Sequence, residues 1–190
     1  HMLVKEPKER GQAPCMIVFC GEDQMQTIED YGKQYGFNHH IRLYFIKNYS
    51  AQVLKANMRI VGAMEFGVLL YREKLPKFNN NGQMVYNWFY VERDNSVPKL
   101  HPTQKSILLL KKLIRLFTDP GDVVIDPVAG SATTLRAAAE LGRSAYGFEI
   151  KKNFYLEAKE KMLTNIQKEI IFDTPAQIAN EYTIFDFMKE

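Results

Sequence analysis

The second half of the chain alternates between strand and helix patterns, and this alternation limits the fold more than any other feature of the sequence. The apolar run at residues 122–126 predicts a buried strand, and residues 131–141 then show a helical pattern that Gly142 closes. Residues 144–150 predict a second strand, and the amphipathic pattern from 151 to about 170 predicts a long helix. Two strand–helix pairs in succession predict an α/β fold whose parallel strands are joined by right-handed crossovers.

The first half of the chain predicts four strands and one helix. The continuous apolar run at residues 15–20 (CMIVFC) predicts a buried strand of the parallel type. A helical pattern follows over residues 22–35, and β-branched and aromatic residues predict strands at 40–47, 62–72 and 84–91.

A further helix is predicted where the two halves join. Thr103 is its expected N-terminal cap, and the residues between 107 and 117 place apolar side chains at helical spacing. The basic residues Lys111, Lys112 and Arg115 are expected to point outward from this helix.

The composition is that of one ordinary globular domain and excludes several other classes. The 190 residues are 46% hydrophobic and 25% charged, which excludes a disordered chain. No apolar run approaches the roughly 18 residues that cross a bilayer, and the N-terminus lacks the pattern of a signal peptide. The sequence therefore predicts a cytoplasmic protein without a membrane partner. Its two cysteines, Cys15 and Cys20, predict neither a disulfide nor a metal site.

A turn of small residues follows the strand at 122–126, and this turn is the candidate ligand site. In an open α/β sheet, ligands bind beyond the carboxyl ends of the strands. Gly130 lets the backbone approach a ligand, and Ser131 and Thr133 offer hydroxyl groups. Glu149 follows Asp126 at about the 20-residue spacing at which an acidic residue accepts hydrogen bonds from ribose hydroxyls. A tight turn followed by a surface glutamate explains the same pattern equally well.

The turn does not fit a cofactor that contains phosphate. It matches neither the G-x-G-x-x-G pattern of nicotinamide enzymes nor the G-x-x-x-x-G-K pattern of P-loop proteins. The carboxylate of Asp126, beside the turn, would also repel a phosphate. S-adenosylmethionine fits better, because it has a ribose, an adenine and an ammonium group that Asp126 can pair, but no phosphate.

Several segments together resemble the β-class DNA amino-methyltransferases, the bacterial and phage enzymes that methylate adenine N6 or cytosine N4. The matching segments are HPTQK at 101–105, DPGD at 119–122, DPVAGSATT at 126–134, LGR at 141–143 and GFEI at 147–150. The resemblance implies a Rossmann-like methyltransferase fold, S-adenosylmethionine as the cofactor, and site-specific DNA methylation of the restriction-modification type. It also implies the cofactor-binding residues, which are His101, Pro102, Thr103, Gln104, Lys105, Asp126, Gly130, Ser131, Thr133 and Glu149.

The resemblance further implies how the chain is divided and what it binds. A methyltransferase domain is expected over residues 1–170, with a partial catalytic and DNA-facing region at 15–100 and a cofactor-binding region at 101–170. Residues 171–190 are expected to form a C-terminal extension. Double-stranded DNA is the expected partner, no metal is expected, and a homodimer or a catalytic partner subunit would be the assembly.

The turn departs from the family pattern at two positions. The family usually has an aromatic residue and a second glycine where this chain has Val128 and Ala132. If the backbone at residue 132 requires a positive φ, alanine costs about 1 kcal/mol or more, and its methyl group would crowd the cofactor. Cofactor binding would then be weak or absent, and Ala132→Gly is expected to tighten it.

The catalytic tetrapeptide of the family, Asp-Pro-Pro-Tyr, does not occur in the sequence. In the family this tetrapeptide precedes the strand that resembles residues 15–20, and it holds the target amino group while its aromatic ring stacks on the flipped base. Asp119-Pro120 and Asp126-Pro127 are already matched to other family segments, so no catalytic residue is predicted on this chain. Either an N-terminal segment is missing from the chain, or the protein is an inactive pseudo-methyltransferase that binds DNA or a partner.

Basic residues are concentrated between residues 42 and 77, a stretch that contains seven Lys or Arg residues but only two Glu residues and no Asp. Within this stretch, Lys47, Lys55 and Arg59 are the candidate DNA-binding residues, because cations there can contact phosphates. An ordinary solvated surface is the alternative explanation.

Two further groups of residues allow more than one interpretation. The alternation of Tyr86, Trp88 and Tyr90 permits base stacking, but one buried face of a strand is favoured. The pair His39 and His40 has no acidic or cysteine partner at ligand spacing, so a solvated turn is favoured over a metal site.

Overall fold

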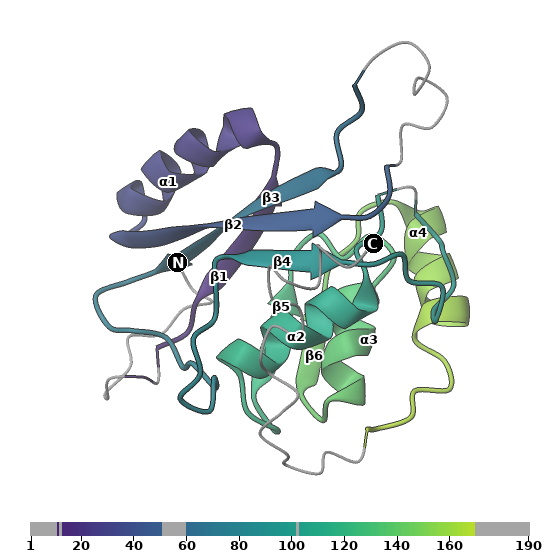
Figure 1. Cartoon of the computed structure of the whole chain (residues 1–190). Coiled ribbons are helices and arrows are strands. Elements are labelled where there is room, and N and C mark those ends of the chain that lie inside the picture. The colour runs from purple at the N-terminus through teal and green to yellow at the C-terminus, as the bar shows by residue number, and fades with distance from the viewer. Residues whose placement is uncertain (1–10, 12, 51–59, 102, 170–190) are drawn as a thin grey trace. The chain divides into compact units, whose positions relative to one another are not determined.

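The computed structural model describes residues 11, 13–50, 60–101 and 103–169 (Figure 1). These residues form two compact units, and the boundary between them along the chain lies between Arg93 and Asp94. The predicted regions 15–100 and 101–170 divide the chain nearby, and as functional regions they stay predictions. Among the described residues, no helix is both long and apolar enough to span a membrane.

The first unit contains a four-stranded sheet and one α-helix. In chain order its elements are β1 (Met16–Cys20), the short 3₁₀ helix Glu22–Gln24, α1 (Met25–Gln34), β2 (His39–Lys47), β3 (Met64–Tyr71) and β4 (Trp88–Val91). The strand order is β1-β3-β2-β4, in which β3 runs antiparallel to both β1 and β2, whereas β2 and β4 are parallel.

The predicted direction of the first strand is wrong. β1 pairs antiparallel with β3, with Met16 opposite Leu70 and Cys20 opposite Phe66. The predicted burial is wrong as well, because β1 is an edge strand of its sheet and none of its residues is fully buried. A continuous apolar run is typical of a strand covered on both faces, but by itself it determines neither the burial of the strand nor the direction of its neighbour.

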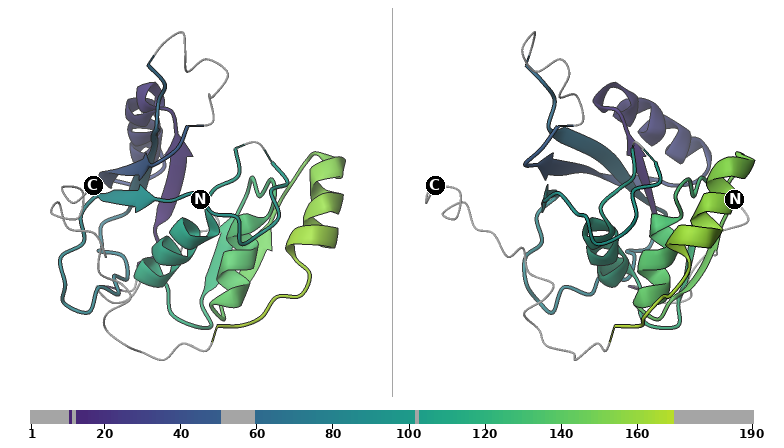
Figure 2. Two further views of the ribbon diagram at one scale, coloured as in Figure 1. Left: turned by 45° about the vertical axis from the view of Figure 1, so that its right-hand side comes forward. Right: turned by 90° about the vertical axis from the view of Figure 1, so that its right-hand side faces the viewer.

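Apolar side chains hold α1 against one face of this sheet. Figures 1 and 2 show α1 lying along the sheet, and Met25, Phe37, Val68 and Leu70 form a buried cluster there. Gly32 permits this close approach, because a Cβ atom there would lie 3.1 Å from Cδ2 of Leu70.

An ion cluster around the buried Glu29 fastens α1 to β2 as well. Glu29 is only 3% exposed, and its carboxylate accepts a hydrogen bond of 2.6 Å from Nε of Arg42. Nε2 of His40 lies 3.4 Å from the same carboxylate. The hydrogen bond from Arg42 holds the pKa of Glu29 below the ordinary value, against the opposing effect of burial. His39 and His40 are the first two residues of β2, so the solvated turn predicted for them is wrong. The His39 ring stacks on the Tyr71 ring, with ring centroids 5.1 Å apart.

This ion cluster predicts a pH-dependent stability. Because folding lowers the pKa of Glu29, its carboxylate stabilises the fold above the unfolded-state value of 4.5, and that contribution is lost as the pH falls through the folded-state pKa. We expect Glu29→Gln to lower the free energy of unfolding by roughly 1 to 2 kcal/mol at pH 7. Below pH 4 the difference from the wild type should shrink. Urea denaturation at the two pH values measures this, with the exposed Glu73→Gln as a control that should change stability by less than about 0.5 kcal/mol.

The second unit contains the predicted strand–helix alternation. Its elements are α2 (Ile107–Phe117), β5 (Val123–Asp126), α3 (Thr133–Glu140), β6 (Ser144–Gly147) and α4 (Lys152–Glu157), and α4 continues as a π-helical segment, Ala158–Met162. β5 and β6 are parallel, with Val123 paired to Ser144. α3 packs closely on this pair, because a Cβ atom on Gly147 would lie 2.7 Å from Cδ1 of Leu135. The predicted parallel pair joined by a helix is therefore confirmed, whereas the predicted burial of its first strand is not, because no residue of β5 is fully buried.

In the second unit, three predicted boundaries differ from the structure by two or more residues, and one predicted cap differs as well. The strand predicted to reach residue 150 ends at Gly147, and the helix predicted to reach about 170 ends at Met162. The first turn of the predicted helix at 131–141 is instead part of the small-residue turn, so α3 begins at Thr133. Ser106, and not Thr103, caps α2 by accepting the N–H of Leu109.

Hydrogen bonds explain why α2 begins at residue 107. The ring Nδ1 of His101 accepts the backbone N–H of Thr103, which keeps that part of the chain non-helical. The carboxylate of Asp94 accepts the N–H of Ile107 at 3.1 Å and thereby caps the helix from outside. Burial raises the pKa of Asp94, but hydrogen bonds from Ser96 and from the first turn of α2 bring it below the usual range.

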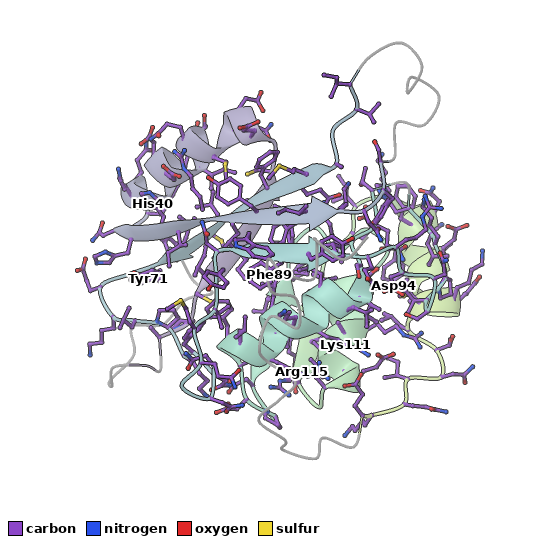
Figure 3. The ribbon with its side chains drawn as sticks, in the orientation of Figure 1. His40, Tyr71, Phe89, Asp94, Lys111 and Arg115 are labelled. Carbon is purple, nitrogen blue, oxygen red and sulfur yellow. The ribbon has the colours of Figure 1, made fainter. Side chains whose placement is uncertain are left out.

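Lys111 does not point outward as the sequence predicts. It is 8% exposed, and its ammonium group pairs with Glu140 of α3 and with Glu169 at 2.6 Å. Figure 3 shows Lys111 and Arg115 on the same helix, and Arg115 also pairs with Glu169. Burial lowers the pKa of Lys111, but the two carboxylates raise it above the usual value. A basic residue at the margin of an apolar face is buried when a carboxylate from another element neutralises it.

Candidate functional site

The turn between β5 and α3 lies at the carboxyl end of the parallel pair, where the sequence predicts the ligand site. Asp126 ends β5, and its carboxylate accepts the N–H of Val128 at 3.1 Å. The backbone N–H of Ala129 donates to the carbonyl of Phe148 at 2.9 Å, which fastens the turn to the chain leaving β6. Gly130 has φ +52°, a left-handed conformation that glycine adopts at little cost.

Glu149 joins the turn to the start of α4. One of its carboxylate oxygens, Oε2, accepts the N–H of Gly130 at 2.9 Å, and the other, Oε1, accepts the N–H of Lys151 at 2.7 Å. Glu149, which follows β6, is therefore hydrogen-bonded to the turn that contains Asp126 and Gly130, as expected for two acidic groups at neighbouring strand ends. Phe148 and Ile150, which flank Glu149 in the chain, are 63% and 98% exposed, so apolar surface lies next to this carboxylate.

The two hydroxyl groups of the turn are less available than the sequence predicts. Oγ of Ser131 and Oγ1 of Thr133 are 2.8 Å apart and hydrogen-bonded to each other. Ser131 is 6% exposed and Thr133 is 3% exposed. Their first role here is to hold the start of α3, and a ligand would reach them only by breaking this hydrogen bond.

The segment at residues 101–105 is ordered by its own side chains. Nδ1 of His101 lies 2.9 Å from Oγ1 of Thr103, and the Gln104 amide accepts the N–H of Leu100 and donates to the carbonyl of Pro98. Lys105 is partly buried, and Pro102 lies outside the described residues.

Phe154 connects this segment to the chain that follows Glu149. The His101 ring packs edge-on against the Phe154 ring with centroids 4.7 Å apart, and Nζ of Lys151 lies 5.6 Å from the centroid of the same ring. Sequence reasoning did not single out Phe154, because a lone aromatic residue on a helix most often belongs to a core. The two predicted cofactor segments are thus linked by contacts within one unit.

Ala132 has the positive φ that the family comparison suggests, but its methyl group does not face an open site. Its φ is +60° and its ψ is +25°, in the left-handed region. It is 3% exposed and belongs to an apolar cluster with Ala158 and Met162. The expectation that this methyl crowds a cofactor is therefore wrong, because the side chain is packed in the core. Val128, at the other departure from the family pattern, is 82% exposed.

This geometry changes the expected effect of Ala132→Gly. Glycine removes about 1 kcal/mol of backbone strain, but it also loses about 0.8 kcal/mol of methyl burial and makes the unfolded chain more flexible. These effects nearly cancel, so we expect stability within about 1 kcal/mol of the wild type and no gain in ligand affinity. The control Ala137→Gly, at a fully buried position inside α3, should cost about 1 to 2 kcal/mol. Thermal unfolding and ligand titration of both variants measure this, and a variant that binds ligand tenfold tighter would contradict it.

Of the three predicted DNA-binding residues, the structure describes only Lys47. The Lys47 side chain is only 10% exposed, and Nζ donates to Oε1 of Glu65 at 2.9 Å. Lys47 is therefore neutralised by an ion pair and is a poor candidate for a phosphate contact. Lys55 and Arg59 lie outside the described residues.

The aromatic alternation along β4 is partly accessible. Tyr86 is 51% exposed and stacks on Trp88, with ring centroids 5.8 Å apart and an interplanar angle of 14°. Trp88 and Tyr90 are half-buried, which fits the favoured interpretation of a strand face more closely than a fully exposed stacking platform.

Comparison with known proteins gives a consistent picture. The family model N6_N4_Mtase, described as DNA methylase, matches residues 12–160. The putative methylase YubD of Escherichia coli K12 is 27% identical over 147 residues, which covers 77% of this chain and 61% of YubD. The DNA adenine methyltransferase YhdJ of the same strain is 48% identical over 54 residues, covering 28% of this chain and 18% of YhdJ. The chain thus spans less than two thirds of either relative.

A solved structure supports the same fold. The crystal structure of the M1.HpyAVI–SAM complex aligns with a TM-score of 0.66 and 28% sequence identity, covering 78% of this chain and 74% of that protein. The Rossmann-like α/β methyltransferase fold that the sequence predicts is therefore confirmed.

Proposed function

The chain belongs to the N6/N4 DNA methylase family, and on this basis we propose that it is part of a β-class DNA amino-methyltransferase that binds S-adenosylmethionine at the turn between β5 and α3. The proposed reaction moves the methyl group to the exocyclic amino group of adenine (N6) or cytosine (N4) in double-stranded DNA. A homodimer or a catalytic partner subunit is the proposed assembly.

The observation that carries this proposal is the hydrogen bond from the N–H of Gly130 to the carboxylate of Glu149. A phosphate-binding turn presents free backbone N–H groups to the ligand, whereas here a carboxylate already occupies that N–H and Asp126 adds a second carboxylate. This set of groups disfavours a pyrophosphate and suits the hydroxyls of a ribose and the ammonium of an amino acid. S-adenosylmethionine has both of these groups and no phosphate, so the residues present fit it.

The proposed roles toward the cofactor divide among its ribose, its ammonium group, its adenine ring and its methionine half. Glu149 accepts hydrogen bonds from the ribose hydroxyls, and Asp126 pairs with the ammonium group. The exposed side chains of Phe148 and Ile150 supply an apolar surface for the adenine ring. The segment at residues 101–105 holds the methionine half. When bound, S-adenosylmethionine supplies a methyl group on a positively charged sulfur, which a nearby amino nitrogen can attack, and the chain contributes mainly by positioning. M1.HpyAVI, which was crystallised with SAM, supports this assignment.

A second candidate function rests on a different observation. The sequence of 190 residues contains no Asp-Pro-Pro-Tyr tetrapeptide. A pseudo-methyltransferase would lack this tetrapeptide while it keeps the cofactor-binding fold, and it would act as a DNA-binding or partner-binding subunit. Such a protein would bind S-adenosylmethionine or DNA and transfer nothing.

The choice of cofactor is tested by ligand-induced thermal stabilisation. A ligand that binds only the folded state stabilises it by about 2.7 kcal/mol at 100 times its Kd. S-adenosylmethionine and S-adenosylhomocysteine should therefore raise the Tm of the chain, whereas NAD and ATP at the same concentration should leave it unchanged. Stabilisation by NAD or ATP alone would overturn the proposed cofactor.

A further inference from the structure

Two cations lie close to one tyrosine ring at the carboxyl ends of β2 and β4. The two strands are parallel and Lys47 is paired with Val91, so the residues that follow each strand leave the sheet side by side. Tyr49 comes two residues after β2, and Arg93 comes two residues after β4. Nζ of Lys47 lies 5.4 Å from the centroid of the Tyr49 ring, and Cζ of Arg93 lies 5.3 Å from it.

The two cations differ in what else they contact. Lys47 is largely buried and forms its ion pair with Glu65, so its charge is already balanced. Arg93 is exposed, and its guanidinium lies over the Tyr49 ring. A guanidinium over an aromatic ring is held there by a cation–π attraction that uses none of its N–H donors, so those donors can still bind the oxygens of a phosphate. Tyr49 therefore holds the Arg93 guanidinium in place without consuming its hydrogen-bond donors.

Arg93 has an acidic residue on either side of it in the chain, and one of these carboxylates is already used in other hydrogen bonds. The carboxylate of Asp94 accepts hydrogen bonds from Ser96 and from the N–H of Ile107, so it is committed to capping α2. Glu92 is the other acidic neighbour along the chain and is exposed. The wider stretch of residues 42–77 carries seven basic and two acidic residues, and it keeps a basic excess after Arg42 is paired with Glu29 and Lys47 with Glu65, which favours an anionic partner.

We propose that Arg93 contacts a phosphate of the DNA substrate and that Tyr49 is its positioning residue. This inference rests on the proposed function, because it names a group that holds the DNA of the methyl-transfer reaction. It replaces Lys47 as the described residue of the chain best placed for a phosphate contact.

The test is the salt dependence of DNA binding by the full chain. Fluorescence anisotropy with a mixed-sequence duplex of about 20 base pairs gives Kd between about 50 and 200 mM salt, where each phosphate contact contributes a slope of about 0.9 in log K against log salt. We expect Arg93→Gln to weaken binding about 3- to 10-fold at the low end and to reduce the slope by about 1. Lys33→Gln, which removes the same charge from the exposed side of α1, should leave the slope unchanged.

A pair of Tyr49 variants separates positioning from general stability. Tyr49→Phe keeps the aromatic face and should bind DNA like the wild type, because the ring and not the hydroxyl carries the stacking. Tyr49→Leu removes the face and should weaken binding about 2- to 5-fold, with the Tm recorded for both variants. If Tyr49→Leu does not fold, the Arg93→Gln result alone decides, because Arg93 is exposed.

The outcomes distinguish this inference from the proposed function. If the wild-type chain binds the duplex and Arg93→Gln leaves both Kd and slope unchanged, the role of Arg93 is wrong while DNA binding stands. If Arg93→Gln and Lys33→Gln weaken binding equally, the effect is one of net charge, and the specific contact is again wrong. If the folded chain binds S-adenosylmethionine but no duplex at all, both the inference and the DNA half of the proposed function are overturned.

Discussion

The 190-residue chain is expected to transfer no methyl group to DNA, even with saturating S-adenosylmethionine. Positioning supplies most of the rate in a transfer of this kind, because the amino nitrogen must be held about 3 to 3.5 Å from the methyl carbon. The family holds that nitrogen with an Asp-Pro-Pro-Tyr tetrapeptide, which the sequence does not contain. Asp126-Pro127 is not counted as a replacement, because it is matched to the cofactor turn of the family and the Asp126 carboxylate is assigned to the ammonium group of the cofactor.

A radiolabelled-methyl assay on mixed-sequence duplex DNA measures this directly. The reaction contains the 190-residue chain with labelled cofactor, and a parallel reaction contains the same chain extended upstream by its own coding sequence. Incorporation at background by the first, with activity in the second, supports a methyltransferase whose catalytic segment lies upstream. Background in both supports the pseudo-methyltransferase. Robust incorporation by the 190-residue chain would mean that residues within this sequence perform the catalytic role.

Glu149→Ala is expected to weaken the binding of S-adenosylmethionine about 5- to 150-fold, which corresponds to roughly 1 to 3 kcal/mol. Two losses combine in this variant. The ligand loses a charged acceptor for its ribose hydroxyls, and the N–H groups of Gly130 and Lys151 lose the carboxylate that holds the turn against α4. Isothermal titration gives the affinity, with the unfolding temperature recorded to confirm that the variant is folded.

Two companion variants sharpen this result. Glu149→Gln keeps one acceptor oxygen and should fall between the wild type and Glu149→Ala. Glu157→Ala removes a carboxylate from the exposed side of α4, where Glu157 pairs with Lys161, and should change the affinity less than 2-fold. Wild-type affinity in Glu149→Ala would remove Glu149 from the site.

The β5–α3–β6 unit could be predicted from the sequence because its information is local. The apolar run before Asp126, the small-residue turn and Gly142 each specify their structure through nearby residues, and β5 and β6 are indeed parallel. The spacing of Glu149 from Asp126 agreed with a position beside the turn, since parallel strands end at one edge of a sheet, but a surface glutamate fitted the same spacing until the hydrogen bond to Gly130 was seen. The antiparallel pairing of β1 with β3 was not predictable in this way, because strand direction depends on partners about 50 residues apart in the chain.

The remaining differences have the same cause. Lys111 is buried because Glu140 and Glu169 neutralise its charge. Both carboxylates come from other parts of the chain, so the helical pattern around Lys111 could not predict this pairing. Arg93 could not be predicted as a candidate residue, because Tyr49, the ring it lies over, is distant in sequence. The residues next to Arg93 in the chain do not distinguish it from an ordinary surface arginine. The positive φ of Ala132 agrees with the glycine expected there, but only the packing against Met162 shows where its methyl group lies.

The central claim is that the turn between β5 and α3 binds S-adenosylmethionine, and isothermal titration of the wild-type chain with this cofactor tests it most directly. Because the candidate cofactor residues that the structure describes lie in one compact unit, binding should not depend on DNA or on a partner. The account predicts saturable binding of one cofactor per chain, and S-adenosylhomocysteine should compete for the same site. A chain that unfolds cooperatively on heating, yet gives no saturable binding of either compound, would contradict the account.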